Sequence, residues 1–251
     1  MRRFFVAENL LNQAQITLPK EVAHHIKTVL RLPLGAEILL CDGRGHCCHC
    51  RVDQLSSNSG CAAVLNHWFD EETALRIELI QGLPSGDKFD LILQKNTELG
   101  VTLFQPVTTE RSQFSLPANK LAKKMQRWQR IVCEAARQSE RAWLPKVSDP
   151  LPVAGALSQC GAEVKLVLWE EARQPLNAVL PPSAPQSVAV LVGSEGGLSP
   201  AEVDGAMAHG FVPVSLGPRI LRTETAGMAI AAILQFHYGD LDQLPKRNYQ
   251  G

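Results

Sequence analysis

The sequence lacks the features that mark membrane, secreted and disordered chains. It has no apolar run of about 18 residues, so we expect no transmembrane helix and no membrane partner. Its start, "MRRFFVAENLLNQ", has basic residues but neither a continuous apolar core nor a small-residue cleavage site, which favours a cytoplasmic protein. There is no internal repeat and no low-complexity tract. With 45% hydrophobic and 20% charged residues, the chain has the composition of a folded globular protein.

Two glycine signatures of nucleotide binding are also absent. The chain contains no G-x-x-x-x-G-K-[ST] phosphate loop and no G-x-G-x-x-G after an early strand. Nucleoside triphosphates and dinucleotides are therefore disfavoured as ligands.

The seven cysteines do not have the spacing of a zinc site. Four lie in "CDGRGHCCHC" beside two histidines, but Cys47, Cys48 and Cys50 form no C-x-x-C pair, and no second ligand pair follows. In a strand, Cys48 and Cys50 would face one side, with Cys47 and His49 on the other. We expect a strand with small, soft side chains in a reducing compartment, and no metal.

The net charge of zero hides an uneven distribution along the chain. Residues 1–72 carry a net charge of −1, residues 73–150 carry +4 and residues 151–251 carry −3. A polyanionic partner would therefore be met mainly by the middle of the chain.

The first ~70 residues indicate a small β-rich unit. "AEILLCDGRGHCCHCRVDQLSS" predicts two strands joined by a glycine-rich turn, and "GCAAVLNHWF" predicts a third. Before them, "KEVAHHIKTVLR" predicts a short amphipathic helix with Val22, Ile26, Val29 and Leu30 on its apolar face. The polar stretch "FDEETA" at 69–74 is the expected domain boundary.

From residue 75 onward, strands and helices alternate. "LRIELIQGL", "VTLFQPVTT", "VKLVLWEE", "SVAVLVG" and "FVPVSLG" predict strands, several of them apolar enough to be covered on both faces. Helices are predicted in "GDKFDLILQKNTELG", "ANKLAKKMQRWQRIVCEAARQSER", "SPAEVDGAMAHG" and "TETAGMAIAAILQFHYG". The pattern indicates an α/β domain with a largely parallel sheet. We expect the tail at 244–251 to be loosely held.

Three loops follow apolar strands at their carboxyl ends, where open α/β sheets bind ligands. They are "WEEARQP" (169–175), "GSEGGLS" (193–199) and "LGPRILRTETA" (216–226). Glycines in the second loop permit close approach by a ligand. Ser199 is a predicted N-cap, with Pro200 in the first turn of the helix and Glu202 at the capping-box position. In the third loop, the arginines serve no packing purpose at the start of an apolar helix.

The last two loops together resemble the SPOUT methyltransferases, most closely the ribosomal RNA small subunit methyltransferase E family. The resemblance extends along nearly the whole chain: "HHIKTVLRLPLG" and "DGRG" resemble that family's PUA-like barrel, and "QKNTELGV", "ERSQF" and "RWQRIVCEAARQSER" its early SPOUT region. The family usually has Pro where this chain has Ser194. The change alters loop stiffness but keeps the ligand-facing glycines.

The resemblance implies an α/β fold with a small β-barrel PUA-like domain at 1–72, which would bind RNA, a SPOUT domain at 73–243 and a tail at 244–251. It implies a deep trefoil knot, S-adenosylmethionine as methyl donor, and a homodimer with active sites at the shared interface. The implied reaction is methylation of N3 of uracil 1498 in the 16S ribosomal RNA of the small ribosomal subunit.

Adenosylmethionine needs tight backbone contacts, which glycine loops at strand ends provide. For Leu216 and Leu221, plain core packing is an equally good interpretation of the side chains. The residues assigned to cofactor binding are Gly193, Glu195, Gly196, Leu216, Gly217, Leu221, Arg222 and Thr223.

Uracil N3 must lose its proton before it attacks the methyl group, and the resulting negative charge spreads onto O2 and O4. A fixed cation would stabilise that charge, and Arg222 or Arg219 has suitable donors. Glu195, Glu224 or a water would accept the proton. For Glu224, favourable placement in the first turn of the last helix, after Thr223 as its N-cap, is a slightly better interpretation than catalysis.

RNA contact requires positive charge on one face. Lysines and arginines recur at three- and four-residue steps on the long helix, a pattern that also suits a solvated face, but this segment is the most basic of the chain. The residues assigned to RNA binding are His25, Lys27, Arg31, Arg111, Lys120, Lys123, Lys124, Arg127 and Arg141. Two other functions stay open: a catalytically silent RNA-binding protein, and a ribose 2′-O methyltransferase.

Overall fold

The computed structural model describes residues 1–72, 74–112 and 118–244. They form two compact units: residues 1–72 with 136–144 and 244, and residues 74–112 with 118–135 and 145–243. Most of the predicted tail at 244–251 lies outside the described residues. Within the described residues, no helix is long and apolar enough to cross a membrane.

The N-terminal unit is built on a five-stranded mixed sheet in the order β1-β3-β4-β5-β2. β1 and β3 are parallel, whereas the other neighbours are antiparallel. The three predicted strands are confirmed, but β1 and β2 were not predicted because four residues are too few for a periodic pattern. The strands are β1 (Arg2–Phe5), β2 (Gln15–Leu18), β3 (Glu37–Cys41), β4 (His46–Leu55) and β5 (Gly60–Phe69).

Short helices cover this sheet. α1 (Glu8–Leu11) follows β1, and α2 (Lys20–His24) continues as a π-helical turn, η1 (His25–Val29). The predicted apolar face is confirmed for Val22 and Ile26, but Val29 is 60% exposed. In the π-helical turn, Leu30 N–H donates to His25 O at 2.9 Å. This five-residue step is wider than that of an α-helix, so Val29 is rotated away from the apolar face on which a regular helix would place it.

The cysteine-rich strand lies in the centre of the sheet. As predicted, Cys48 and Cys50 share one face and are buried in the apolar core. Burial raises the pKa of Cys48 to about 11 and that of Cys50 to about 12, so both stay protonated. Cys41 and Cys47 lie opposite each other on β3 and β4 and form a disulfide, a pairing that was not predicted.

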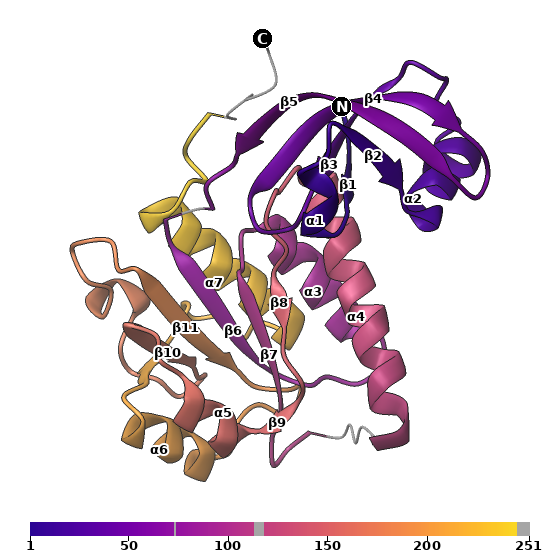
Figure 1. The fold of residues 1–251 in the computed structure, drawn as a ribbon. Coiled ribbons are helices and arrows are strands. Elements are labelled where there is room, and N and C mark those ends of the chain that lie inside the picture. Colours follow the sequence, from indigo (N-terminus) through magenta and orange to yellow (C-terminus); the bar gives the residue numbers. More distant parts are fainter. Residues whose placement is uncertain (73, 113–117, 245–251) are drawn as a thin grey trace. The chain divides into compact units, whose positions relative to one another are not determined.

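The second unit contains a seven-stranded sheet in which every pair is parallel (Figure 1). Its order is β12-β10-β11-β6-β7-β8, with β9 also paired to β7, and the predicted parallel sheet is confirmed. The two-residue strands β8 and β9 gave no sequence pattern. The strands are β6 (Arg76–Gly82), β7 (Leu103–Thr108), β8 (Lys146–Val147), β9 (Leu151–Pro152), β10 (Val164–Leu168), β11 (Ser187–Val192) and β12 (Val212–Val214).

Helices cover both faces of this sheet. α3 (Lys88–Glu98), α7 (Thr223–Tyr238) and the part of α4 (Ala118–Gln138) up to residue 135 pack on one face, where Trp128 meets Phe89 edge-on at 4.7 Å. α5 (Val153–Gln159) and α6 (Pro200–Ala208) pack on the other. Because both faces are covered, the strands are continuously apolar and only their ends are free for ligands.

Helix boundaries agree with the predicted capping except at α7. Gly100, at φ +85°, ends α3, and Ser199 and Glu202 form the predicted capping box of α6. Thr223 is not the N-cap of α7: Arg222 occupies that position without a side-chain hydrogen bond. The hydroxyl of Thr223 instead bonds to the glycine loop.

Candidate functional site

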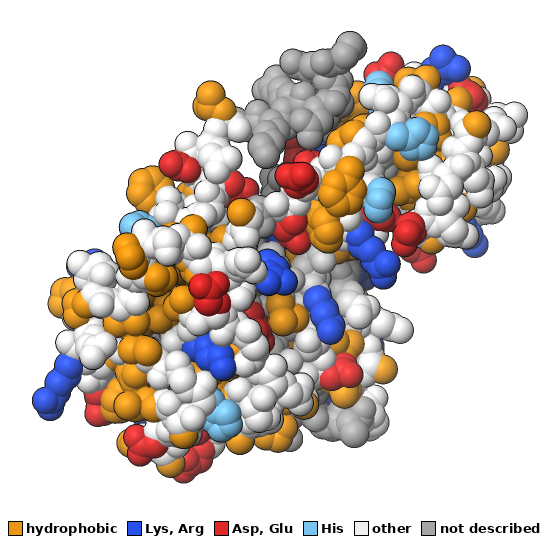
Figure 2. Space-filling view, turned by 60° about the vertical axis from the view of Figure 1, so that its left-hand side comes forward, with side chains coloured by type: hydrophobic (Ala, Val, Ile, Leu, Met, Phe, Trp, Pro, Cys, Tyr) orange, Lys and Arg blue, Asp and Glu red, His pale blue; other side chains and the backbone are white. Residues whose placement is uncertain are grey.

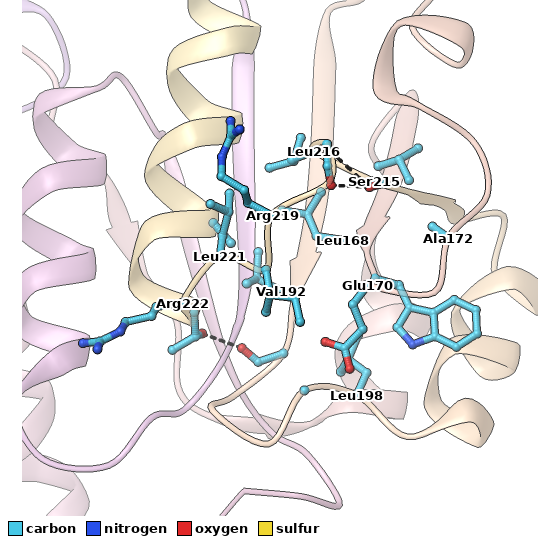
Figure 3. A pocket seen from close by; sticks show the side chains of 18 of the residues that line it. Leu168, Glu170, Ala172, Val192, Leu198, Ser215, Leu216, Arg219, Leu221 and Arg222 are labelled. Carbon is cyan, nitrogen blue, oxygen red and sulfur yellow. Dashed lines mark hydrogen bonds between the residues drawn. The ribbon is translucent and has the colours of Figure 1, made fainter.

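Three loops at the carboxyl ends of β10, β11 and β12 surround a cavity of about 790 Å³ (Figure 3). Its lining comes from residues 168–170, 172–175, 192–195, 197–198 and 214–224, together with Lys88 and Ala226. The volume lies within the range of small-molecule sites. The glycine turn and the arginine-bearing turn thus converge on one space.

Most of the predicted cofactor residues lie around this cavity. Arg219 and Glu224, proposed for catalysis, also line it. The predicted cofactor residues that line it are Gly193, Glu195, Leu216, Gly217, Leu221, Arg222 and Thr223.

Gly196 does not line the cavity. A Cβ at this position would lie 2.9 Å from both the carbonyl oxygen and the Cβ of Arg111. The Arg111 side chain also donates from Nη1 to Gly196 O at 3.3 Å. Gly196 is therefore a glycine because the loop packs against residue 111, and its assignment as a cofactor contact stays a prediction.

A buried amide ties the loops together from beneath. Gln81, on β6 and fully buried, donates from Nε2 to Gly193 O at 3.2 Å and to Thr223 Oγ1 at 2.8 Å. Thr223 Oγ1 in turn donates to Gly193 O at 2.6 Å. Sequence reasoning missed Gln81, although a glutamine inside the apolar run "LRIELIQGL" was the available signal.

Ser194, in the glycine loop, is buried and uses its hydroxyl. It is 5% exposed, and its Oγ lies 3.2 Å from Thr109 Oγ1, which is 2.9 Å from Ser112 Oγ. These hydroxyl contacts link the glycine loop to the loop after β7.

Glu195 is held by groups at the start of α3. Its Oε1 accepts hydrogen bonds from Lys88 Nζ at 2.8 Å, Ser85 Oγ at 2.7 Å and Ser85 N–H at 3.0 Å. Burial alone would raise the pKa of Glu195, but the Lys88 and Ser85 hydrogen bonds outweigh it and lower the pKa to about 2. A carboxylate so stabilised is a poor proton acceptor, so Glu195 is a weaker candidate for the general base than the sequence indicated.

Two other carboxylates face the cavity. Glu224 is half-buried in the first turn of α7, and exposed Glu170 lies in the loop after β10. A Cβ on Gly197 would lie 3.8 Å from Oε2 of Glu170, so this carboxylate stands over the glycine turn. We recognised the "WEEARQP" loop from its position after a strand but selected no residue in it.

The two arginines diverge. Both are exposed, and Figure 3 shows the side chains of Arg219 and Arg222 leaving their loop in different directions. Each is therefore placed to meet a different part of a ligand.

The structure divides the basic residues of α4. Lys120 and Lys123 are exposed and Lys124 is half-buried. Arg127 instead forms ion pairs with Asp90, which raises its pKa further, and with Asp87 at 3.2 Å. Its guanidinium is already neutralised, so Arg127 is a poor candidate for phosphate contact.

The remaining predicted RNA contacts also differ in availability. Arg111, Lys27 and Arg31 are exposed. Arg141 is only 13% exposed in its side chain and pairs with Glu72 at 2.8 Å, and the ring of half-buried His25 lies 3.3 Å from Arg137 Nη1. Arg141 and His25 are therefore weaker candidates.

Positive charge does not gather into one patch on the face seen in Figure 2, where Lys and Arg side chains stand among Asp and Glu. Among the residues described, no three His, Cys, Asp and Glu side chains are arranged to hold a metal ion.

Residues 71–235 match the family described as RNA methyltransferase domain, and residues 18–64 match the RNA methyltransferase PUA domain. Ribosomal RNA small subunit methyltransferase E of Synechocystis sp. is 38% identical, with 89% of this chain and 74% of that protein aligned. The Bacillus subtilis protein of the same name is 34% identical, with 93% and 96% aligned.

A crystal structure of the Neisseria gonorrhoeae ribosomal RNA small subunit methyltransferase E bound to S-adenosyl methionine is similar over 96% of this chain and 99% of that one. Its TM-score is 0.88 and its sequence identity is 38%.

Proposed function

The chain belongs to the ribosomal RNA small subunit methyltransferase E family, and from that premise we propose that it methylates N3 of a uridine, the family target uracil 1498, in 16S ribosomal RNA. The methyl donor is S-adenosylmethionine, which is bound in the related Neisseria structure. The observation that carries the proposal is the single cavity formed by the glycine and arginine turns at the ends of parallel strands.

The residues around this cavity suit the methyl donor. Leu168, Val192 and Leu216 supply apolar surface for an adenine ring, and the loops supply backbone groups at their sides. Gly217 has φ +107°, and a Cβ there would meet nothing within 4 Å, so the glycine serves the backbone conformation and leaves space in the cavity. When bound, S-adenosylmethionine supplies an electrophilic methyl group.

The chain's own groups would prepare the uracil. Arg222 or Arg219 would stabilise the negative charge on O2 and O4 after N3 loses its proton. Since Glu195 is engaged by Lys88, Glu224, Glu170 or a water is the acceptor of that proton.

The remaining assignments follow from family membership. We keep residues 1–72 as the RNA-binding PUA-like domain and 73–243 as the SPOUT domain with a trefoil knot, and we place the protein in the cytoplasm. A homodimer is supported by large apolar side chains exposed on α7, with Ile233 41% and Phe236 65% exposed. Sedimentation of the purified protein would test the dimer.

The two competing functions are weaker. A silent RNA-binding protein would have no reason to retain a cavity of about 790 Å³ lined by ionisable groups. Ribose 2′-O methylation has no specific observation in its favour.

The decisive experiment maps methylated nucleotides in 16S ribosomal RNA from cells with and without the gene. N3 methylation blocks base pairing and stops reverse transcription, whereas 2′-O methylation leaves the pairing edge intact. Loss of one uridine-N3 stop in the deletion strain, restored by the wild-type gene and not by Arg222→Ala, would support the proposal. An unchanged stop pattern would exclude it.

A further inference from the structure

A second cavity lies inside the N-terminal unit, between α1 and the β4–β5 pair. It has a volume of about 220 Å³. The side chains around it include Glu8, Asn12, His46, His67 and Phe69. None of them has a part in the methyl transfer proposed above.

Flat rings form one side of this cavity. His46 and Phe69 are paired across β4 and β5, and their rings meet edge to face with centroids 5.0 Å apart. Phe69 also meets Trp143 edge to face, with centroids 6.0 Å apart, but it stays 51% exposed, so these contacts leave part of its ring open to a ligand. His67 lies two residues earlier on β5 and so shares the same face of the sheet.

The two histidine rings are held in position from behind. The Asp42 side chain is fully buried, and its Oδ2 lies 2.8 Å from His46 Nδ1 while its Oδ1 accepts the backbone N–H of Arg44 at 2.6 Å. His67 Nδ1 lies 3.1 Å from Sγ of Cys48, which is 1% exposed. Both rings are thus oriented before any ligand arrives, which reduces the entropy lost on binding.

The chemistry of the lining selects the ligand class. The space is small for a whole nucleotide, but it suits one planar heterocycle lying against aromatic walls. The Asn12 amide and the Glu8 carboxylate offer hydrogen bonds to the edge of such a ring, while Glu8 disfavours an anion inside. Outside the cavity, the Arg44 side chain is 75% exposed. Its contact with Glu8, at 3.4 Å, is that of a weak surface pair, so Arg44 can also contact a phosphate.

We propose that this cavity binds a single unstacked base of an RNA, with the base against His46, His67 and Phe69 and its phosphate outside near Arg44. Proteins commonly recognise single-stranded RNA by stacking splayed bases on aromatic and histidine rings. The inference rests on the proposed function in that it takes RNA as the substrate, and it adds a second contact on the N-terminal unit.

The test measures RNA binding without the methyl donor. Fluorescence anisotropy would compare a labelled random-sequence hexaribonucleotide pool with an abasic hexamer that has the same phosphates. The cavity variants are Phe69→Ala and Asn12→Trp, the second of which fills the opening from an exposed position. The matched control is Leu65→Ala, which removes a 46% exposed apolar side chain of the same strand outside the cavity.

We expect both cavity variants to weaken binding of the base-containing pool about tenfold, the effect of losing one stacked base. Leu65→Ala should bind like the wild type, and the abasic hexamer should bind weakly to every variant. Thermal melts check that each variant is folded, and if Phe69→Ala is unfolded, Asn12→Trp alone decides. Equal binding of the abasic and base-containing hexamers, or equal losses in cavity and control variants, would overturn the inference.

Methyl transfer by the wild type to 16S ribosomal RNA, measured in parallel, separates the two proposals. If the wild type transfers the methyl group but the cavity variants bind RNA like the wild type, only the base-binding cavity is refuted. Binding that depends on Phe69, without any methyl transfer, refutes the proposed function alone.

Discussion

Thr223 is the residue whose replacement best tests how the large cavity is held together. Its hydroxyl donates to Gly193 O at 2.6 Å and accepts from the buried Gln81 amide at 2.8 Å. Thr223→Val keeps the shape of the side chain and removes both hydrogen bonds. At about 1 kcal/mol for each hydrogen bond, with Gly193 O still bonded to Gln81, we expect the free energy of unfolding to fall by about 1–3 kcal/mol.

The same change should weaken binding of the methyl donor, because the glycine loop loses one of its supports. Urea denaturation would measure the stability and titration calorimetry the affinity for S-adenosylmethionine. Thr225→Val, an exposed position on the same helix, is the control and should change stability by no more than about 0.5 kcal/mol. If the two variants have equal stability and equal affinity, the network does not support the cavity as we describe it.

Three further predictions concern the glycine loop and the long helix. The pKa of Glu195, lowered from 4.5 to about 2, means that its interactions stabilise the fold above about pH 4.5 and are lost as the pH falls towards 2. Glu195→Gln should therefore flatten the pH dependence of stability in urea titrations between pH 6 and 3; an unaltered slope would contradict this. Gly196→Ala, whose Cβ would crowd Arg111, should lower the free energy of unfolding by about 1–3 kcal/mol. A variant with wild-type stability would show that the loop moves to make room for the added methyl group. Charge reversal of Lys120 and Lys123 should weaken RNA binding and make the RNA affinity less dependent on salt concentration. If the salt dependence equals that of the wild type, the two lysines do not contact RNA and belong to an ordinary solvent-exposed helix face.

The parts of the fold that could be predicted are those encoded locally. Continuous apolar runs such as "SVAVLVG" indicated strands covered on both faces, and their carboxyl ends indicated where a ligand site would form. The capping box of α6 was equally readable, because Ser199 and Glu202 are only three residues apart. The π-helical turn at His25–Val29 is a local exception, because the spacing of Val22, Ile26 and Val29 predicted a regular helix.

The contacts that the sequence does not show mostly join residues that are far apart in the chain. Arg127 and Asp90 are 37 positions apart, and Arg141 and Glu72 are 69 apart, so no local pattern shows that these arginines are already engaged. Thr223 has the side chain of a good N-cap. In the folded chain, however, its hydroxyl donates a hydrogen bond to Gly193 O instead of capping the helix. Side-chain type indicated what these groups can do, and tertiary structure determined what they do.

The amide of Gln81 reaches a hydroxyl that lies 142 residues further along the chain. During synthesis, the strand that bears this glutamine leaves the ribosome long before the start of α7 has been translated. Contacts of such sequence separation form late, because a long loop must close before they can contribute. A nascent chain therefore cannot complete the binding site for the methyl donor until almost all of the chain has been made. A truncated product that ends before residue 223 would be inactive even if its parallel sheet had formed.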